Sequence, residues 1–462
     1  MTDLITIDVL ILGAGGGGYP AAFFLARAGL HVVMVDPIGN LGGDCLAEGC
    51  VPSKAVREGA LARVMSRKYK FFGLDGTMPA VDWQGVLAHK DLVQNARYAQ
   101  HTKEIAGSTM VFHKGIGRIT GDHTATIAVD GGTPLNYRFR YLIAATGSRP
   151  HILPIPGAEL AITSHHLFRL GADLPMPARL AVIGGGYIGA ESASMLDHLG
   201  VKTTILEATG ELMPGADPDL RTYLTRCLGR RVDLICDALV TGITQGAGGL
   251  RLSYRRDGQD LTLEADAVLM ATGRESVRPE GIGATGLSGS GAIMVDATMR
   301  SAIDHVYAPG DINGRSMLFH SAVRQSMVAA HNILAGGQPV DRMNFHGVPY
   351  TVFTEPEIAW VGIDQPAALT AGLPVATTRY DYLTDSRAQI YGETDGFIKL
   401  VFDTSNGVLL GAQIAGLDAA QVIAPLALAV HAGTTATTLT EMVFPHPMIT
   451  EGINKAARQF RP

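Results

Sequence analysis

The apolar pattern near the start of the chain predicts a strand, a glycine-rich turn, a helix and a second strand, in that order. Residues 5–12 (ITIDVLIL) have the composition of a buried strand and lead directly into Gly13-Ala14-Gly15-Gly16-Gly17-Gly18. Residues 19–28 follow with helical spacing, and the apolar residues 31–35 end at Asp36. A glycine-rich turn without a ligand would explain the glycines, but not the strand, helix and acid around them. We therefore predict a βαβ nucleotide-binding unit.

The same pattern occurs a second time. Residues 179–183 lead into Gly184-Gly185-Gly186-Tyr187-Ile188-Gly189, a helical pattern extends to about residue 199, and residues 202–206 end at Glu207. The acid follows the second glycine at the same spacing in both copies. We predict two nucleotide-binding units of the same architecture in one α/β chain, each a doubly wound Rossmann-like domain.

Each glycine of a G-x-G-x-x-G turn has its own purpose. The first permits the tight turn, the second lets the backbone approach a pyrophosphate, and the third lets the helix pack on the strand. The acid at the end of the second strand suits a ribose hydroxyl. The predicted dinucleotide contacts are Gly13, Gly15, Gly18 and Asp36 in the first unit, and Gly184, Gly186, Gly189 and Glu207 in the second.

Two nucleotide units in one chain indicate two nucleotides, and the usual reason is electron transfer between a tightly held flavin and a diffusible nicotinamide. For the second unit we expect NAD. Glu207 can accept a hydrogen bond from the ribose 2′-hydroxyl, whereas the 2′-phosphate of NADP would need a cation, and residues 208–211 (ATGE) contain none.

Length and charge narrow the picture further. A chain of 462 residues is too long for one ordinary domain of about 100–200 residues, so we expect three. The 47% hydrophobic and 17% charged content indicates a large buried surface, including a subunit interface. The net charge of −6 is not concentrated in a run, so we expect neither a nucleic acid nor a membrane surface as partner.

The chain shows no pattern of secretion or membrane insertion. Asp3 and Asp8 stand where a signal peptide would carry positive charge, and the apolar run over residues 422–430 contains Pro425 and is far shorter than the roughly 20 residues of a membrane span. We expect a cytoplasmic protein.

Two of the four cysteines lie close together in the stretch GGDCLAEGCVPSK, as Cys45 and Cys50. In a regular helix five residues advance about 7.5 Å, more than the usual Cα separation of a disulfide, about 4.4–6.8 Å. A bond between them would need a distorted backbone, which Gly49 permits. The alternatives are two unbonded thiols or half of a zinc site. Cys227 and Cys236 lack zinc-ligand spacing, so we expect no metal there.

With these cysteines in place, the chain resembles the class I pyridine nucleotide-disulfide oxidoreductases, the flavoprotein disulfide reductases. The stretch around Cys45 and Cys50 is similar to their redox-active Cys-x4-Cys. Further motifs follow in that family's order: residues 145–148 (ATGS), 184–191 (GGGYIGAE), 271–274 (ATGR), 307–311 (YAPGD) and 445–447 (PHP) with Glu451. The resemblance covers essentially the whole chain and implies FAD and NAD as cofactors.

The resemblance also implies catalytic roles. Cys50 would face the flavin as a thiolate, and Cys45 would exchange with the substrate sulfur. His446 would be the base, oriented by Glu451, and in this family it reaches the disulfide from the partner subunit. The implied assembly is therefore a homodimer.

Other residues match the family's cofactor sites. Lys54 would stabilise the thiolate and pair with Glu191, Asp311 would bind the ribityl chain, and Tyr187 would cover the nicotinamide pocket. The alternatives without a function are that Lys54 is a solvated surface lysine and that Tyr187 only packs. The remaining matches are Thr146 and Gly147 on the FAD side and Gly273 on the NAD side.

The implied architecture is an FAD-binding domain of residues 1–149 and 276–343, an NAD-binding domain of residues 150–275, and a C-terminal α/β interface (dimerisation) domain of residues 344–462. In the last domain we expect strands over 397–402 and 408–412 and a helix over 419–432, from their apolar patterns.

Within the family the chain is most similar to the dihydrolipoamide dehydrogenases, which oxidise a lipoyl-carrying protein with NAD as acceptor. Alternatives are a related NAD(P)H-dependent reductase of another disulfide, a flavin-bearing structural or sensing subunit of a lipoyl assembly, and a flavin oxidase. Three departures weaken the assignment of the partner: Asp44, where threonine is common and where a carboxylate would raise the pKa of Cys45; Phe444-Pro445 before His446; and Gln421, where an acid is usual.

Overall fold

The segment that enters the first glycine turn forms the centre of a largely parallel sheet in the computed structural model, which describes residues 4–461. Strand β1 (Leu4–Leu12) pairs in parallel with β2 (Val32–Asp36) and with β5 (Leu135–Ala144). Strand β3 (Val111–Gly121) extends the sheet beyond β2, and β15 (Val306–Tyr307) extends it beyond β5. Strands buried on both faces need continuous apolar sequence, which is the pattern of residues 5–12.

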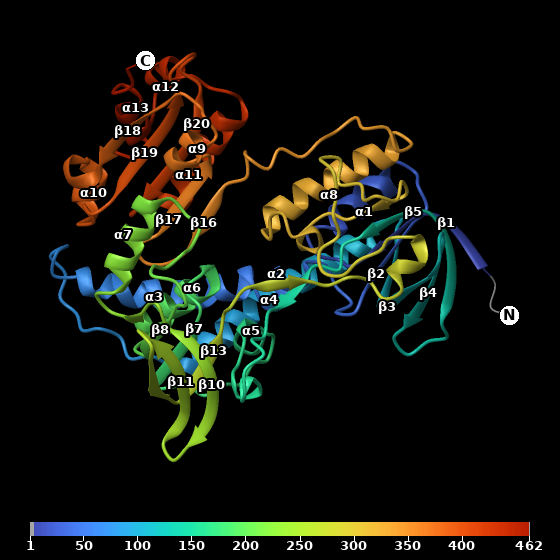
Figure 1. Cartoon of the computed structure of the whole chain (residues 1–462), viewed down its shortest axis with the longest axis horizontal. Coiled ribbons are helices and arrows are strands. Elements are labelled where there is room, and N and C mark those ends of the chain that lie inside the picture. Colours follow the sequence, from blue (N-terminus) through green and yellow to red (C-terminus); the bar gives the residue numbers. More distant parts are fainter. Residues whose placement is uncertain (1–3, 462) are drawn as a thin grey trace.

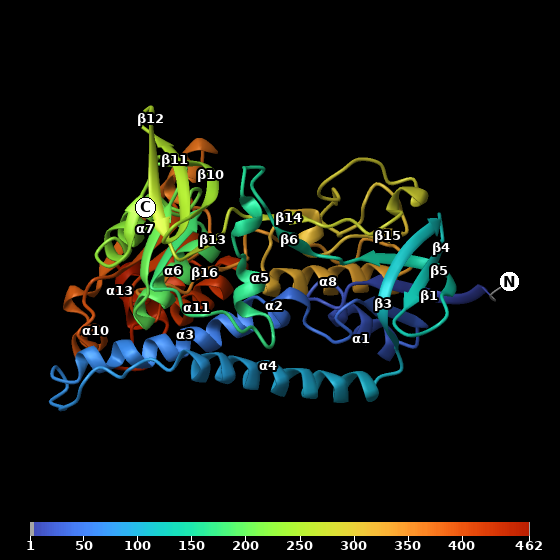
Figure 2. The same cartoon turned by 90° about the horizontal axis from the view of Figure 1, so that it is seen from below.

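Helices cover this sheet on the faces that its apolar side chains require. Helices α1 (Tyr19–Arg27) and α8 (Phe319–Leu334) lie side by side on one face (Figure 1). Strand β4 (Thr124–Val129) joins β3 to β5 in an antiparallel meander. The long helices α3 (Cys50–Met65) and α4 (Trp83–Ala106) pack together and extend below the first unit toward the second (Figure 2). Short elements here are α2 (Gly43–Ala47), η1 (Ser66–Lys68), η3 (Ile282–Thr285) and η4 (Asp311–Asn313).

The second glycine turn belongs to a separate parallel sheet, in the order β13-β7-β8-β9. It is followed by a three-stranded antiparallel sheet, β10-β11-β12. The strands are β7 (Arg179–Ile183), β8 (Lys202–Leu206), β9 (Asp233–Ile235), β10 (Leu239–Gly246), β11 (Gly249–Arg256), β12 (Gln259–Ala265) and β13 (Ala267–Met270). The helices are η2 (Ala158–Leu160), α5 (Ser164–Phe168), α6 (Tyr187–Leu199) and α7 (Pro218–Leu228).

The C-terminal part forms a five-stranded antiparallel sheet, β16-β17-β20-β19-β18. Its strands are β16 (Tyr350–Val352), β17 (Ile358–Gly362), β18 (Val375–Asp381), β19 (Phe397–Asp403) and β20 (Leu409–Ala415). Helix α11 (Ala419–His431) packs on β17 and β20, as its apolar pattern predicts. The other helices are α9 (Gln365–Thr370), η5 (Tyr382–Thr384), α10 (Ser386–Tyr391), α12 (Ala436–Glu441) and α13 (Glu451–Ala457). The predicted fold class, two Rossmann-like units and a C-terminal α/β unit, is confirmed.

The chain crosses between the first two units twice, and the two crossings pair with each other. Strand β6 (Ser148–Pro150) leaves the first unit, and β14 (Arg274–Ser276) returns antiparallel to it. We propose a division into residues 1–149 with 276–343, residues 150–275, and residues 344–462. The two boundaries between the first two units then fall in this small sheet. Residues 1–3 and 462 lie outside the described residues. No helix within residues 4–461 is long and apolar enough to cross a membrane.

Buried charges connect the second unit to the C-terminal unit. The ammonium of Lys399 on β19, 7% exposed, lies 2.7 Å from the carboxylates of both Asp217 and Asp219 at the start of α7. A buried ammonium is tolerated only when it is paired and hydrogen-bonded, so this contact fixes one arrangement of the two units.

Candidate functional site

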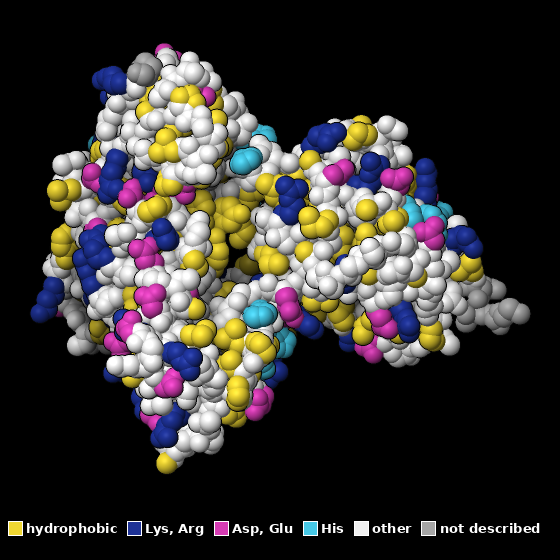
Figure 3. Space-filling model, viewed as in Figure 1, with side chains coloured by type: hydrophobic (Ala, Val, Ile, Leu, Met, Phe, Trp, Pro, Cys, Tyr) yellow, Lys and Arg dark blue, Asp and Glu magenta, His cyan; other side chains and the backbone are white. Residues whose placement is uncertain are grey.

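A cavity of about 1500 Å³ lies where the three units meet. In the space-filling view it is the hollow between the lobes, bordered by hydrophobic side chains (Figure 3). Thirteen of the predicted site residues line it: Gly13, Gly15, Asp36, Cys45, Cys50, Lys54, Thr146, Gly147, Gly186, Tyr187, Glu191, Gly273 and Asp311. The C-terminal unit contributes Tyr350, Thr351 and Phe353 from and beside β16, and Ala420 from α11. The sequence prediction therefore identified residues from distant segments that share one space.

The two cysteines lie on either side of a break between two helices. Cys45 is in α2, which ends at Ala47, and Cys50 begins α3. Between them Glu48 (φ −158°, ψ 12°) and Gly49 (φ −123°, ψ −112°) depart from helical geometry. The helix is interrupted between Cys45 and Cys50, where a disulfide would need a distorted backbone. Both thiols are free in this structure.

The two thiols differ in acidity because they hydrogen-bond to each other. A hydrogen bond from Cys45 lowers the pKa of Cys50, against the effect of burial, and Lys54 lowers it further. The same hydrogen bond, together with burial, raises the pKa of Cys45. The first proton lost from the reduced pair therefore leaves Cys50, and the thiolate is the sulfur on the Lys54 side.

Asp44 affects this pair less than the sequence suggested. The carboxylate of Asp44 forms an ion pair with the guanidinium of Arg274, which also donates a hydrogen bond of 2.7 Å to the Ser148 hydroxyl. The pKa of Cys45 is raised, as expected, but the leading causes are the hydrogen bond to Cys50 and burial. The predicted direction of the shift is therefore met, while its leading causes differ from the predicted one, and the Asp44 carboxylate is paired with Arg274.

Asp311 lies at the other end of this network. Its carboxylate accepts a hydrogen bond of 2.6 Å from Ser148, and burial raises its pKa in spite of that bond. Thr146 and Gly147 lie in the neighbouring loop, where the Thr146 hydroxyl donates to the carbonyl of Val277. A Cβ on Gly147, or on Gly273 next to Arg274, would meet nothing within 4 Å. These loops leave room for a ligand beside an acceptor carboxylate.

Lys54 and Glu191 join the first two units behind Cys50. The Lys54 ammonium lies 2.6 Å from a carboxylate oxygen of Glu191 on α6 and 4.4 Å from the centre of the Phe353 ring. The other Glu191 oxygen accepts a hydrogen bond of 2.9 Å from the Phe353 backbone. The prediction that Lys54 pairs with Glu191 is met, and the solvated-lysine alternative is not.

The first glycine turn has the shape that a dinucleotide requires. A Cβ on Gly13 would lie 2.2 Å from the Ala145 carbonyl oxygen, and one on Gly18 would lie 1.9 Å from the Gly13 carbonyl oxygen. A Cβ on Gly15 would have only the Cα of Gly43 within 4 Å, at 3.7 Å, and Gly15 lines the cavity. Asp36 accepts hydrogen bonds of 2.8 Å from Ala14 and Ile38, and burial raises its pKa against them. These residues fit FAD.

The second turn repeats this arrangement. A Cβ on Gly184 would lie 2.5 Å from the Ala271 carbonyl oxygen, and one on Gly189 would lie 1.9 Å from the Gly184 carbonyl oxygen. A Cβ on Gly186 would meet nothing within 4 Å. Glu207, 7% exposed, accepts hydrogen bonds from the Gly185 backbone at 2.6 Å and from Thr209 at 2.8 Å. The site fits NAD, although Gly184, Gly189 and Glu207 lie outside the lining of the large cavity.

Tyr187 belongs to an aromatic stack that the sequence did not reveal. Its ring stacks on Trp360 at 6.0 Å and on Tyr350 at 6.4 Å, and these two rings are parallel at 5.1 Å. Burial raises the pKa of Tyr187, so the ring stays neutral. Tyr187 therefore both packs and lines the cavity, and no local pattern links it to strands β16 and β17.

The polar pair Lys90 and Gln94 on α4 was also missed. Gln94, fully buried, donates hydrogen bonds of 2.9 and 2.8 Å to the carbonyls of Leu46 and Ala47, the residues that follow Cys45. The fully buried Lys90 ammonium donates to Gln94 at 3.0 Å and to the Arg169 carbonyl at 2.8 Å. In the sequence they are ordinary polar residues of a helix, and only the fold places them under the cysteine helix.

His446 and Glu451 form a pair that is separate from the cavity. The Nδ1 atom of His446 lies 3.0 Å from a Glu451 oxygen, and the His446 side chain is 70% exposed. Slight burial raises the pKa of Glu451, but the hydrogen bonds from His446 and from the Met448 backbone hold it below its ordinary value. Neither residue lines the cavity that contains Cys45 and Cys50. A single chain therefore does not bring this base to these thiols.

Comparisons with known proteins find relatives along nearly the whole chain. The family described as "Pyridine nucleotide-disulphide oxidoreductase" matches residues 7–326, and its dimerisation domain matches residues 348–457. A dihydrolipoyl dehydrogenase of Geobacillus stearothermophilus is 33% identical over 458 residues, which is 98% of this chain and 96% of that protein. The protein of the same name from Bacillus subtilis is 32% identical over 459 residues, with the same coverage.

Solved structures are similar over the same extent. LpdA from Mycobacterium tuberculosis has a TM-score of 0.88 at 26% identity and covers 99% of both chains. The HOCl-induced flavoprotein disulfide reductase RclA from Escherichia coli has a TM-score of 0.84 at 24% identity, covering 98% of this chain and all of that one, which shows the shared fold.

Proposed function

Because the chain belongs to the pyridine nucleotide-disulphide oxidoreductase family, we propose that this disulfide oxidoreductase is a dihydrolipoamide dehydrogenase that transfers electrons from protein-bound dihydrolipoamide to NAD. Membership of the family confirms the predicted resemblance. The family uses FAD and NAD, the two nucleotides predicted from the glycine turns. The match to a dimerisation domain supports a homodimer. The lipoyl substrate is suggested by the names of the relatives over almost their full length.

The observation that carries the proposal is the placement of Cys45 and Cys50 on either side of a helix break in the cavity, with the Lys54–Glu191 ion pair behind Cys50. In the oxidised enzyme a thiolate of dihydrolipoamide attacks the sulfur of Cys45, and the bond between Cys45 and Cys50 breaks with Cys50 leaving as thiolate. The second thiol of dihydrolipoamide loses its proton and attacks the lipoyl sulfur of the mixed disulfide, which releases Cys45 and completes lipoamide. Cys50 is the better leaving group because its pKa is the lower of the two.

The base for this exchange is His446 of the partner subunit in our proposal. The Nδ1–H of His446 donates a hydrogen bond to the Glu451 carboxylate, so Nε2 of the ring can take the proton from the dithiol. The high exposure of the ring in one chain suits a group that completes a site on another chain.

The remaining residues would hold the cofactors and the charge. Gly13, Gly15, Gly18 and Asp36 would hold the nucleotide half of FAD, and Asp311, Thr146 and Gly147 its ribityl side. FAD, when bound there, would supply the two-electron redox chemistry that connects the Cys50 thiolate with NAD. Lys54, oriented by Glu191, balances the negative charge on that path. Glu207 with Gly184, Gly186, Gly189 and Gly273 would hold NAD. Tyr187 would cover the nicotinamide pocket when NAD is absent.

One observation favours a second candidate, an NAD(P)H-dependent reductase of another disulfide. Gln421 stands where lipoamide enzymes usually have an acid, and its neighbour Ala420 lines the cavity. Steady-state rates with dihydrolipoamide and NAD, compared with rates for glutathione disulfide and coenzyme A disulfide with NADH or NADPH, separate the two. The proposal expects the dihydrolipoamide reaction to exceed the others at least a hundredfold in kcat/KM. A higher value for another disulfide contradicts it, and negligible turnover with all of them indicates a structural or sensing subunit.

A further inference from the structure

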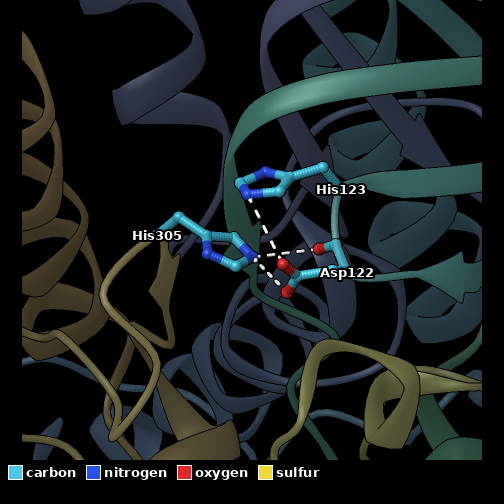
Figure 4. A group of neighbouring side chains, drawn as sticks. All are labelled: Asp122, His123 and His305. Carbon is cyan, nitrogen blue, oxygen red and sulfur yellow. Dashed lines mark hydrogen bonds and ion pairs between the residues drawn. The ribbon is translucent and has the colours of Figure 1, made fainter.

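We propose that Asp122, His123 and His305 bind one divalent ion of the zinc and copper class, at a site separate from the redox centre. The residues come from the turn between β3 and β4 and from the residue before β15 (Figure 4). One ligand atom from each residue lies within 4.8 Å of the others. The cysteines gave no zinc pattern in the sequence, and this group is assembled only by the fold.

The site lies where strand β5 changes partner. Residues 135–138 of β5 pair with β4, and residues 142–143 pair with β15, while β1 occupies the opposite edge of β5 along nearly its whole length. The start of β4 therefore meets the start of β15 beside the middle of β5. Backbone hydrogen bonds hold both histidines there: Phe139 donates to the His123 carbonyl at 3.0 Å, and Leu142 donates to the His305 carbonyl at 2.9 Å.

The ligand atoms have nearly the separations of a metal centre. The Nε2 atom of His123 lies 3.7 Å from one Asp122 carboxylate oxygen, and Nε2 of His305 lies 3.5 Å from the other. Zinc bonds of about 2.0–2.1 Å in tetrahedral geometry place ligand atoms about 3.3 Å apart. Both distances are within a few tenths of an ångström of that value, but they run to two different carboxylate oxygens. Because one atom from each residue lies within 4.8 Å of the others, side-chain rotation would bring one oxygen and both nitrogens to a common ion.

The protonation of His123 also suits a ligand. Its Nδ1 lies 3.0 Å from the Phe139 carbonyl oxygen, which can only accept, so the hydrogen is on Nδ1. The lone pair is therefore on Nε2, which points toward Asp122 and His305 (Figure 4). A hydrogen bond from the non-ligating nitrogen to a backbone carbonyl is the usual support of a metal-binding histidine.

His305 completes the group from the opposite side. Its ring stacks on that of His123 with centroids 3.9 Å apart, and its Nε2 donates to the Asp122 carbonyl at 3.0 Å. On metal binding the ring proton moves to Nδ1, and the freed Nε2 lone pair binds the ion. The side chains of His305 and His123 are 14% and 38% exposed and that of Asp122 is 66% exposed, so an ion reaches the site from the Asp122 side.

The donor set selects the class of ion. Two imidazole nitrogens and one carboxylate suit zinc, copper and their neighbours, whereas calcium and magnesium require mostly oxygen ligands. Three protein ligands leave a position for water.

The test uses the full-length FAD-loaded protein with Cys45→Ser and Cys50→Ser, because those thiols would bind the same ions. Titration calorimetry with ZnCl₂ and electron paramagnetic resonance with CuSO₄ report the stoichiometry and the nitrogen ligands. We expect one equivalent to bind, with nitrogen hyperfine splitting on copper, and Asp122→Asn, His123→Gln and His305→Gln each to weaken binding at least tenfold.

His31→Gln, which removes an exposed histidine outside the group, is the matched control and should leave binding unchanged. Circular dichroism and flavin content establish that each variant is folded. The proposal is overturned if no stoichiometric equivalent binds, if the three variants bind as tightly as the parent protein, or if His31→Gln weakens binding as much as they do.

Discussion

Lys54 and Glu191 form an ion pair of 2.6 Å that joins the helix after Cys50 to the helix after the second glycine turn. The pair holds the Lys54 ammonium in position between the cysteines and the nicotinamide side of the cavity. Because Lys54 is one of the groups that lower the pKa of Cys50, the pair links thiolate chemistry to the geometry of the NAD unit.

Lys54→Met should therefore raise the pKa of Cys50 and slow turnover about tenfold or more. The measurement is the pH dependence of the long-wavelength absorbance of the two-electron-reduced enzyme, which requires the Cys50 thiolate. In the parent protein the band should persist below the ordinary thiol pKa of about 8.5 and be lost as pH falls through the lowered pKa of Cys50. Its midpoint should move to higher pH in Lys54→Met and not in Lys103→Met. An unmoved midpoint contradicts this role of Lys54.

Gln94→Leu should loosen the helix that carries Cys45. The change leaves the carbonyls of Leu46 and Ala47 without their buried donor, which costs about 1–3 kcal/mol of unfolding free energy, and removes one of the hydrogen bonds of the Lys90 ammonium. Rapid-mixing measurements should show a slower reduction by dihydrolipoamide, with hydride transfer to NAD little changed. Equal slowing of both steps would indicate a general loss of structure instead of a misplaced Cys45.

Glu207→Gln should raise the KM for NAD about tenfold and narrow the preference for NAD over NADP. The carboxylate now accepts hydrogen bonds from Gly185 and Thr209, and a neutral amide weakens both these contacts and the one proposed to the ribose. The control is Glu211→Gln, whose carboxylate pairs with Arg221 at 3.2 Å close by. Steady-state kinetics with the two nucleotides measure the effect, and an unchanged KM removes Glu207 from the NAD site.

Mixing two inactive variants tests whether the site spans two subunits. Cys45→Ser and His446→Gln should each lose at least 99% of activity as homodimers. When they are refolded together, heterodimers contain one site with an intact cysteine pair and an intact histidine from the other chain, so activity should return to about a quarter of the parent value. If the His446 that serves each cysteine pair belonged to the same chain, the mixture would stay inactive.

The parts of this site that the sequence predicted are those with local signals. Glycine is required where a Cβ would lie less than 3 Å from a backbone atom, as at Gly13, Gly18, Gly184 and Gly189. Such close approaches recur wherever a strand, turn and helix pack in this way. Cys45 and Cys50 were visible as a pair, and Lys54 and Glu191 through the family resemblance.

The residues that were missed act across long sequence separations. Gln94 supports Leu46 from a different helix, and Trp360 stacks on Tyr187 from another unit. Arg274 pairs with Asp44, and the leading causes of the raised pKa of Cys45 are its hydrogen bond to Cys50 and its burial, which the sequence did not reveal. Each of these depends on how the sheets are placed, which apolar periodicity does not determine.

The central claim is that electrons pass through the Cys45 and Cys50 pair, with the Cys50 thiolate next to the flavin. Anaerobic titration of the FAD-loaded enzyme with dihydrolipoamide tests it most directly. We predict a long-wavelength absorbance band that grows to one equivalent per subunit, disappears in Cys50→Ser and is unaffected in Cys236→Ser. Flavin bleaching without that band in the parent protein, or an undiminished band in Cys50→Ser, would contradict the account.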